Sequence, residues 1–533
     1  MSKTVLVQNL KLPLQIDPQE YPSLFAGQLS LSKDCISGVR IVRQAIDARK
    51  KNDVCFSVHA ALTMDDATAQ KMIAQKKASE LPPLRLTPLK HGKREQRGRI
   101  AVVGLGPCGL FAAWQLAQEG YKPLVLERGK CMDERKADVE EFWRSGKVLR
   151  NSNAVFGEGG AGTFSDGKLT TRIKDERITK VLRKLISCGA PKEIEYLAKP
   201  HIGTDKLREV IVNMRKEIET LGGQVLFSTE LVDFHCANGQ LDTITIFSGC
   251  ETLRIPCCAL LLAIGQGAGD TYRMLFNKGL ALAPKAFAVG VRAEHPQVMI
   301  NRSQYGDFYN HPRLGAASYA LTGKSGERGV YTFCMCPGGK VIGSASADKQ
   351  VVTNGMSDYA RDGENANAAI VVQVTPDDYG YEPLDGLKFR EQLEKDAFNL
   401  GGGDGVAPAC LVGDILKGVA TKHFGSVKPT YRPGVKPVDM RDCLPDFVYQ
   451  GVRDGIKSFA RQLKGYDLND SVLTAVESRT SSPLRILRDD TLQSPTVRGL
   501  YPIGEGAGYA GGIVSAAVDG LKAAEQVIFE YKD

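Results

Sequence analysis

The chain has 533 residues, of which 43% are hydrophobic and 24% charged, a composition typical of a soluble globular protein. This length exceeds one ordinary hydrophobic core, so we expect two or three domains. The longest apolar run is too short to span a bilayer, and no signal-peptide pattern opens the chain, so we expect no membrane span and a cytoplasmic location. The 13 cysteines include no C-x-x-C pair, which argues for reduced thiols and against a zinc ribbon or a disulfide scaffold.

The net charge of +8 falls entirely within residues 1–99, because the rest of the chain carries equal numbers of basic and acidic residues. Residues 1–80 predict a small basic αβ domain, and residues 81–98, which are proline-rich and then basic, predict a linker. The elements expected in this domain are a strand over Thr4–Leu10, a helix through Arg40–Arg49 capped by Asp34 or Ser37, a strand over Val54–Val58, and a helix from Asp65 or Asp66 to about Ser79. The basic residues could form a nucleic-acid surface, but no aromatic stacking motif accompanies them, which favours a solvated helix face.

Residues 99–127 predict a dinucleotide-binding βαβ unit, around which the rest of the chain is arranged. A buried strand over Ile100–Val103 leads into Gly104, Gly106 and Gly109, spaced G-x-G-x-x-G, and a helix follows. The three glycines permit a tight turn, close approach to a pyrophosphate and close helix packing, and the helix N-terminus presents N–H groups to the phosphates. A second strand, Leu124–Leu126, ends at Glu127, whose carboxylate can accept hydrogen bonds from a ribose 2′-OH.

The same glycine spacing recurs at Gly157–Gly162 and at Gly506–Gly511, but without the strand, helix and second strand. Five glycines lie within residues 157–167, which is incompatible with a regular element. Such a loop either brings backbone amides close to a flat or anionic ligand, which we favour, or runs over the surface.

The remaining elements are expected in the following order. A helix covers Lys206–Thr220, and a meander follows at Val225–Phe227, Leu231–Cys236, Leu241–Phe247 and Thr252–Pro256. Ala259–Gly265 predicts a separate, fully buried strand. Residues from about 284 to 475 predict an inserted, sheet-based domain, and Gly499–Gly520 predicts a short strand, a glycine-rich turn and a helix.

Three pieces together resemble the glutathione-reductase-like superfamily of flavoproteins with two dinucleotide-binding domains. They are the fingerprint with Glu127, the apolar strand ending at Gly265, with Ile264 where threonine is usual, and the strand ending at Gly504-Glu505, with glutamate in place of aspartate. In that superfamily the last carboxylate holds the ribityl chain, and the following helix N-terminus points at the pyrimidine edge of the flavin.

The stretches His201–Leu207, Phe287–Pro296, Cys334–Gly339 and Asn354–Ser357 are similar to an uncharacterised bacterial FAD-dependent dehydrogenase family. The resemblance covers nearly the whole chain and implies FAD as cofactor. It implies an α/β architecture in which a Rossmann-like FAD domain (residues 99–283 and 476–533) is interrupted by an α+β substrate domain (284–475). The candidate cofactor-binding residues are Gly104, Gly106, Pro107, Cys108, Gly109, Glu127, Arg128, Gly159, Gly160, Thr163, Val232, Ala263, Gly265, Gly504, Glu505, Gly511, Gly512 and Ile513.

The expected function is an FAD-dependent oxidoreductase that acts on a small or apolar substrate, with NAD(P)H as a possible electron partner that would use the cleft facing the flavin. The alternative is a nucleic-acid-associated flavoprotein whose basic N-terminal domain is the binding module. The candidate catalytic residues are His295, a possible general acid or base, and Cys334 and Cys336. One intervening residue puts both thiols on one face of a strand, so they form a thiol pair lining the pocket, a redox-active pair, or two buried packing residues. The histidines show no metal-ligand spacing, so no metal is expected.

Overall fold

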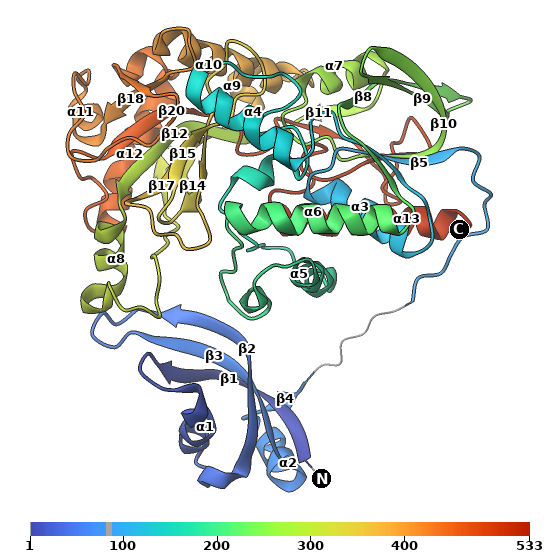
Figure 1. Ribbon diagram of the computed structural model, residues 1–533. Helices are drawn as coiled ribbons and strands as arrows, with labels where there is room; N and C mark the ends of the chain where they lie inside the picture. The colour runs from blue at the N-terminus through green and yellow to red at the C-terminus, as the bar shows by residue number, and fades with distance from the viewer. Residues whose placement is uncertain (1, 82–87) are drawn as a thin grey trace. The chain divides into compact units, whose positions relative to one another are not determined.

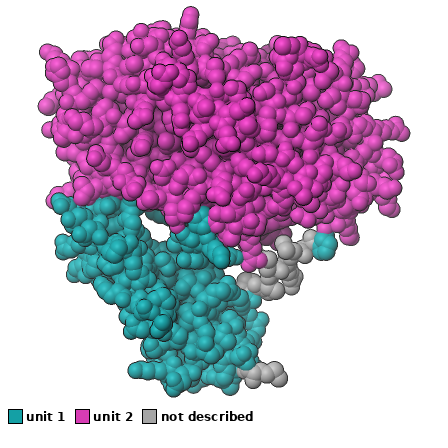
Figure 2. Space-filling view, in the orientation of Figure 1, with its two compact units in different colours: residues 1–88, 191–200, 301–317 teal, residues 89–190, 201–300, 318–533 magenta. Residues whose placement is uncertain are grey.

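The computed structural model describes residues 2–81 and 88–533 and has a mixed α/β architecture with several sheets. The chain divides into two compact units (Figures 1 and 2). The first unit contains residues 1–88, 191–200 and 301–317, and the second contains residues 89–190, 201–300 and 318–533. Six residues of the expected linker, 82–87, lie outside the described part of the chain. No helix within the described ranges is long and apolar enough to cross a membrane.

The first unit is built on a four-stranded antiparallel sheet in the order β2-β3-β1-β4. Its elements follow the chain as β1 (Ser2–Pro13), α1 (Tyr21–Leu29), β2 (Ile36–Asp47), β3 (Cys55–Asp65), α2 (Asp66–Ala74) and β4 (Ser79–Glu80). Each helix connects two strands that flank a third, which is the split βαβ arrangement of ferredoxin-like folds. Asp65 caps α2 by accepting a hydrogen bond from the Thr68 backbone, as expected.

The expected helix through Arg40–Arg49 is wrong, because this segment lies mostly within strand β2. Two register shifts interrupt the pairing of β2 with β3, one between Ile36 and Gly38 and one between Ile41 and Arg43. Each shift inserts a residue and breaks the two-residue alternation that marks a strand, so the apolar spacing looked helical. Asp34 and Ser37 consequently cap no such helix.

A seven-stranded sheet in the second unit combines the expected βαβ unit with the expected meander. Its strands are β5 (Arg99–Val103), β6 (Leu124–Leu126), β7 (Gln224–Leu226), β8 (Thr229–Ala237), β9 (Gln240–Ser248), β10 (Glu251–Leu262) and β22 (Leu500–Pro502). Strands β7, β6, β5, β10 and β22 pair in parallel in that order, which brings the C-terminal strand next to the core of the N-terminal fingerprint. The helices of this part are α3 (Pro107–Gln118), α4 (Met132–Ser145), α5 (Arg177–Ser187), α6 (Thr204–Thr220), α7 (Gly269–Asn277) and α13 (Ile513–Glu530).

The expectation of separate strands at Thr252–Pro256 and Ala259–Gly265 is wrong, because both segments belong to the single strand β10. The first half of β10 pairs antiparallel with β9, and the second half pairs in parallel with β5 and β22. A register shift between Cys257 and Ala259 separates the halves. The single strand β10 therefore belongs both to the antiparallel meander and to the parallel part of the sheet.

A second seven-stranded sheet has the order β13-β14-β17-β12-β20-β18-β19. Its strands are β12 (Phe287–Pro296), β13 (Thr322–Ser325), β14 (Arg328–Cys336), β17 (Asn365–Val374), β18 (Ala407–Leu411), β19 (Val435–Pro437) and β20 (Val472–Glu477). The remaining elements of this unit are β11 (Leu282–Pro284), α8 (Gln297–Tyr305), β15 (Lys340–Gly343), β16 (Thr353–Met356), α9 (Pro376–Tyr379), α10 (Asp385–Gly401), α11 (Val412–Lys417), α12 (Asp446–Gln462) and β21 (Leu484–Ile486). Strand β20 continues past the expected boundary at residue 475, and the domain boundaries inside this unit stay a prediction.

Helices α3 and α13 pack together although about 400 residues separate them in the sequence. A Cβ on Gly520 of α13 would lie 2.1 Å from the carbonyl oxygen of Cys108 in α3, so only glycine allows this approach. Because the two helices are this close, both of their N-termini open onto the same region, at the carboxyl ends of the parallel strands.

Candidate functional site: a glycine-lined pocket at the ends of the parallel strands

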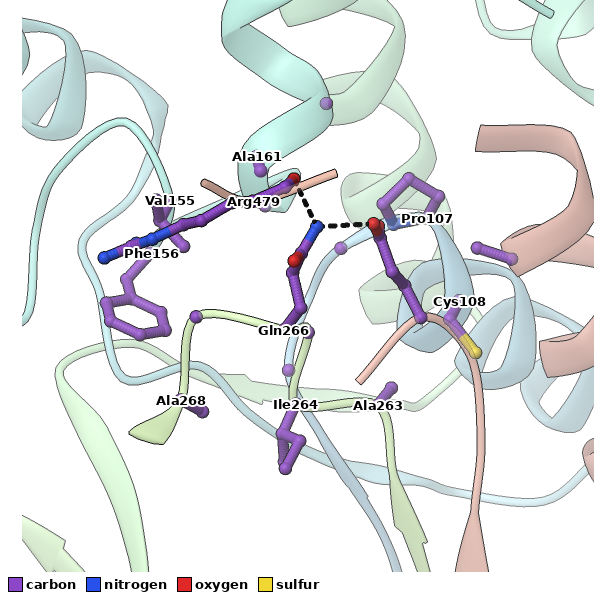
Figure 3. A pocket seen from close by; sticks show the side chains of 18 of the residues that line it. Pro107, Cys108, Val155, Phe156, Ala161, Ala263, Ile264, Gln266, Ala268 and Arg479 are labelled. Atoms are coloured by element: carbon purple, nitrogen blue, oxygen red, sulfur yellow. Dashed lines mark hydrogen bonds between the residues drawn. The ribbon is translucent and has the colours of Figure 1, made fainter. Parts of the chain in front are cut away.

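A pocket of about 410 Å³ lies where β5, β10 and β22 end. Figure 3 shows part of its wall, with Pro107 and Cys108 at the start of α3, and Ala263, Ile264, Gln266 and Ala268 after β10. The predicted residues that line it are Gly104, Gly106, Pro107, Cys108, Glu127, Arg128, Gly160, Ala263, Gly265, Cys334, Glu505, Gly511, Gly512 and Ile513. The structure therefore brings together residues from three glycine-rich segments that are far apart in the chain.

Two glycines of the fingerprint serve the fold. Gly104 has φ +97°, and a Cβ there would lie 2.4 Å from the carbonyl oxygen of Ala263. A Cβ on Gly109 would lie 1.9 Å from the carbonyl oxygen of Gly104. Both positions require glycine for the turn itself, whatever the pocket holds. Gly109 does not line the pocket; it packs the helix against the turn, as its place in the motif predicts.

Gly106 and Gly511 differ, because neither a steric clash nor a positive φ requires glycine there, although Gly106 is the N-cap of α3, where glycine is preferred over alanine. Gly106 has φ −76°, and its Cβ would be 3.8 Å from the nearest atom, the Cα of Gly160. A Cβ on Gly511 would have no neighbour within 4 Å. Both residues line the pocket, so a side chain added at either would stand at the pocket wall. Glycine at these positions is explained by a ligand that approaches the backbone.

Glu127 is buried, and its carboxylate links three loops at the pocket wall through hydrogen bonds. Its carboxylate accepts hydrogen bonds from the backbone N–H groups of Leu105 (2.8 Å), Gly129 (2.8 Å) and Gly157 (2.9 Å). A carboxylate has about four lone-pair sites, so one acceptor direction is left for a ligand hydroxyl. The residue thus positions the loops as well as facing the pocket.

The glycine-rich loop expected to approach a ligand is held by buried charged residues. Arg135 donates hydrogen bonds to the carbonyl of Asn153 (2.9 Å), the carbonyl of Glu158 (2.6 Å) and the hydroxyl of Thr163 (3.2 Å). A Cβ on Gly160 would lie 2.9 Å from the Cα of Gly106, so the loop crosses directly over the fingerprint turn. Thr163 and Gly159 do not line the pocket; they shape this loop from inside.

Glu505 lies in the pocket wall after β22. Its carboxylate accepts a hydrogen bond of 2.7 Å from the side-chain amide of Gln266, which also donates to the carbonyl of Arg479 at 2.9 Å (dashed lines in Figure 3). Burial raises the pKa of Glu505 to about 7. A carboxyl group with this pKa can both accept and donate hydrogen bonds near neutral pH.

Several predicted residues lie away from the pocket. Val232 is 39% exposed on β8 and lies at the register shift between Leu231 and Asp233, so it is turned away from the pocket that Thr229, Glu230 and Leu231 line. Gly504 is packed against Cys108 of α3.

His295 is fully buried in the central strand β12, and its ring Nε2 forms a hydrogen bond of 2.7 Å with the carbonyl of Tyr466. Burial lowers the pKa of His295 to about 4. Its position gives it no contact with a ligand in this pocket.

The two candidate cysteines are placed differently. Cys334 lines the pocket, whereas Cys336 is buried behind it, although alternation predicts that both face the same side. The register of β14 against β17 shifts between Phe333 and Cys336, so a bulge breaks the alternation at this point. All 13 cysteines are free thiols in the structure.

Sequence reasoning missed the polar residues that complete the wall. They include Asp166, Lys168, Gln266, Asn354, Glu477 and Arg479. Asp166 and Lys168 lie at the end of the glycine-rich loop, which is a signal that could have identified them. The others come from β16, β20 and neighbouring loops, and no local pattern connects them. No group of three or more His, Cys, Asp or Glu residues in the described ranges is arranged to hold a metal ion.

The residues present fit an FAD molecule. Two helix N-termini suit anionic or electron-rich groups, Glu127 suits a ribose, and the ligand-dependent glycines Gly106 and Gly511 leave room for close approach to the backbone. Near Glu127, the guanidinium of Arg128 lies 4.3 Å from the ring centre of Phe156 and its Nε is buried without a hydrogen-bond partner. Arg128 lines the pocket, so a polar ligand there is one group that could satisfy this buried donor.

Comparisons with known proteins support the cofactor. Residues 286–480 match a family model described as FAD-dependent protein, C-terminal domain-like, which confirms the prediction of FAD. Residues 4–63 match a model described as a domain of unknown function, DUF8436.

Two solved structures give distant matches. CtdE in complex with FAD is 12% identical, with a TM-score of 0.31 over 80% of this chain and 83% of that chain. A geranylgeranyl bacteriochlorophyll reductase-like protein from Thermoplasma acidophilum is 14% identical, with a TM-score of 0.34 over 81% of this chain and 78% of that chain. Likeness at this level carries no argument about function.

A protein from Clostridium beijerinckii is far more similar. It is called an uncharacterized protein and is 47% identical over 532 residues, which cover 99% of each chain. This chain belongs to the same protein family as the uncharacterized protein of Clostridium beijerinckii.

Proposed function

We propose that the chain is an FAD-dependent oxidoreductase whose Rossmann-like domain holds the cofactor in the pocket described above. The observation that carries the proposal is the meeting of three glycine-rich segments, residues 104–109, 157–162 and 504–512, with Glu127 in one pocket. One extended ligand that contacts all three segments accounts for the glycines that they place at this wall.

In this proposal each part of the pocket holds one part of FAD. The N-terminus of α3 at Gly106 binds the diphosphate, and Glu127 accepts a hydrogen bond from the adenosine ribose. Glu505 holds ribityl hydroxyls. Its side chain is longer than that of the aspartate usual at this position, and a hydrogen bond from Gln266 fixes its carboxylate in place. The N-terminus of α13 after Gly512 stabilises negative charge at the pyrimidine edge of the ring system. When bound, FAD supplies two-electron and one-electron redox chemistry.

The substrate side of the pocket is formed by β14 of the second seven-stranded sheet, by β16 and by the end of the glycine-rich loop. Phe333 and Cys334 of β14, Asn354 of β16 and Lys168 of the glycine-rich loop line this side. An aromatic ring with a small number of polar groups suits a small or apolar substrate that needs orientation. NAD(P)H, if it is the reductant, would enter by this same side.

Spectroscopy of the purified protein tests the proposal. Anaerobic addition of NADH, NADPH or a panel of quinols should bleach the flavin absorbance near about 450 nm for at least one donor, and a quinone or oxygen should restore it. Purified protein that binds FAD but exchanges electrons with no donor or acceptor would contradict an oxidoreductase and leave FAD with a structural role.

No specific observation favours the nucleic-acid alternative. The described strands β1, β2 and β3 contain one phenylalanine, tyrosine or tryptophan, Phe56, and this ring is only 3% exposed. RNA-binding sheets of this topology stack bases on exposed aromatic rings. The basic side chains Arg40 and Arg43 lie on a strand without such rings.

A further inference from the structure

Cys334 has an unusual backbone conformation at the pocket wall. Its φ is +45°, in the left-handed region that non-glycine residues rarely adopt. The bulge in β14 places it there, next to Phe333, while β17 continues as a regular strand opposite. Strained residues of this kind cluster at functional sites, and bulges re-aim a side chain. In this chain the bulge turns the thiol of Cys334 toward the pocket.

The groups around the two cysteines carry surplus positive charge. Lys168 and Arg361 both pair with Asp166, at 3.2 and 2.6 Å, and Arg292 pairs with Glu477 at 2.7 Å. Three cations therefore face two carboxylates in a largely buried network. An uncompensated charge is costly at such depth, and a thiolate would balance it.

The network contacts the cysteines directly. Arg292 donates to the carbonyl of Cys334 at 3.2 Å, and the ammonium of Lys168 lies 3.6 Å from the sulfur of Cys336. A hydrogen bond from the Cys336 thiol, followed by the charges of Lys168 and Arg292, holds the pKa of Cys334 well below its usual range, against burial and the carboxylate of Asp166.

The Cys334 charge also interacts with Glu477, one of the two carboxylates counted above, and with a third carboxyl group, Glu505. Glu477 is already bonded by Arg292, at 2.7 and 2.9 Å. Burial raises the pKa of Glu505 to about 7, so this group is largely neutral below that pH. Neither carboxyl group removes the surplus positive charge around the thiol.

We propose that Cys334 is a nucleophilic thiolate of the flavin pocket and that the pocket takes conjugated carbonyl compounds, to which this thiolate adds. A thiolate is a soft nucleophile that prefers the β-carbon of such compounds. The amide of Asn354 is fixed because its oxygen accepts from the backbone N–H of Gly355 (2.8 Å), so its NH₂ group is available to bind a carbonyl oxygen.

The addition balances without an oxidant. The bond from the Cys334 sulfur to the β-carbon forms, the carbon–carbon π bond breaks, and its electron pair moves to the α-carbon. The α-carbon takes a proton from the ammonium of Lys168, which lines the pocket. The substrate class rests on the proposed function. The addition of the thiolate itself needs no flavin.

Labelling with N-ethylmaleimide, itself a conjugated carbonyl compound, tests the inference on the full chain with FAD bound and after FAD removal. Peptide mass spectrometry gives the rate at each cysteine between about pH 5.5 and 8.5. At pH 6 we expect Cys334 to react at least about tenfold faster than the exposed Cys250, because an ordinary thiol is almost fully protonated there. We expect Lys168→Gln to slow Cys334 at pH 6 at least about fivefold, whereas Lys174→Gln, at an exposed lysine, leaves the rate unchanged.

The outcomes separate the two proposals. The thiolate is overturned if Cys334 reacts no faster than Cys250 in both forms of the protein. It is also overturned if the Cys334 rate rises tenfold per pH unit up to about pH 8, as for an ordinary thiol. Fast labelling only after FAD removal overturns the substrate class, because the cofactor then covers the sulfur. If Lys168→Gln fails to fold, Cys336→Ala should show the same slowing. If Cys334 is labelled fast but the chain binds no FAD, the thiolate stands and the proposed function is overturned.

Discussion

Replacing Gly106 by alanine separates what the ligand requires from what the fold requires. The residue has φ −76°, which alanine adopts freely, and its new methyl group would sit 3.8 Å from the nearest protein atom. The expected loss of stability is therefore that of a less favourable helix N-cap, about 1 kcal/mol. The methyl group would, however, occupy the approach of the diphosphate to the backbone.

Loss of one hydrogen bond to a charged phosphate oxygen costs about 1.5–3 kcal/mol, so we expect FAD to bind roughly 10- to 150-fold more weakly to Gly106→Ala. Gly109→Ala is the matched control within the same motif. Its methyl group would lie 1.9 Å from the carbonyl oxygen of Gly104, and overpacking of this severity costs about 3 kcal/mol or more of stability.

Urea unfolding followed by circular dichroism measures stability, and fluorescence titration measures the FAD dissociation constant. The result that refutes the reasoning is an unchanged dissociation constant for Gly106→Ala. Equal destabilisation by the two substitutions would also refute it, because the fold would then need both glycines for the same reason.

Three further predictions concern the pocket and the first unit. Glu127→Gln keeps the shape of the side chain but turns an N–H donor toward one of three backbone N–H groups, so we expect about 2–3 kcal/mol lower stability together with weaker FAD binding. The control Glu141→Gln, in an exposed pair with Arg144, should leave the urea unfolding midpoint unchanged. Deleting residues 1–80 should leave the flavin absorbance spectrum intact, because every pocket residue lies in the second unit; loss of flavin would contradict this. Folding raises the pKa of Glu505 from 4.5 to about 7, so its contribution to stability is complete below pH 4.5 and is lost as pH rises through 7, by about 3 kcal/mol at most. FAD-free protein should therefore be less stable at pH 8 than at pH 5, and Glu505→Gln should remove that dependence in unfolding measurements.

The parts of the site that a local pattern encodes could be predicted from the sequence. The fingerprint at Gly104–Gly109 is one example, because the motif specifies strand, turn and helix within a few residues. Glu127 is another, because the strand before it fixes its place at the sheet end. The second and third glycine-rich segments are recognisable in the sequence, but their places at this turn come from the structure: Gly160 approaches Gly106 directly, and the parallel pairing of β10 with β22 brings in the third segment.

The parts that depend on register could not be predicted. The bulges of β2 made a strand look helical, and the bulge of β14 places Cys334 in the pocket and Cys336 behind it. The register shift at Cys257 hid the continuity of β10. Arg479 reaches the pocket through tertiary packing alone, and the resemblance that includes Asn354–Ser357 does not indicate that Asn354 lines the pocket.

The most direct test of the central claim is the amount and identity of flavin bound per chain. Protein purified without added cofactor, or reconstituted and then gel-filtered, is denatured, and the released flavin is identified by chromatography and quantified against protein. The account predicts about one FAD per chain, with FMN unable to replace it because Glu127 and the fingerprint turn bind the adenosine and diphosphate. Retention of FMN as readily as FAD, or of no flavin at all after reconstitution, would contradict it.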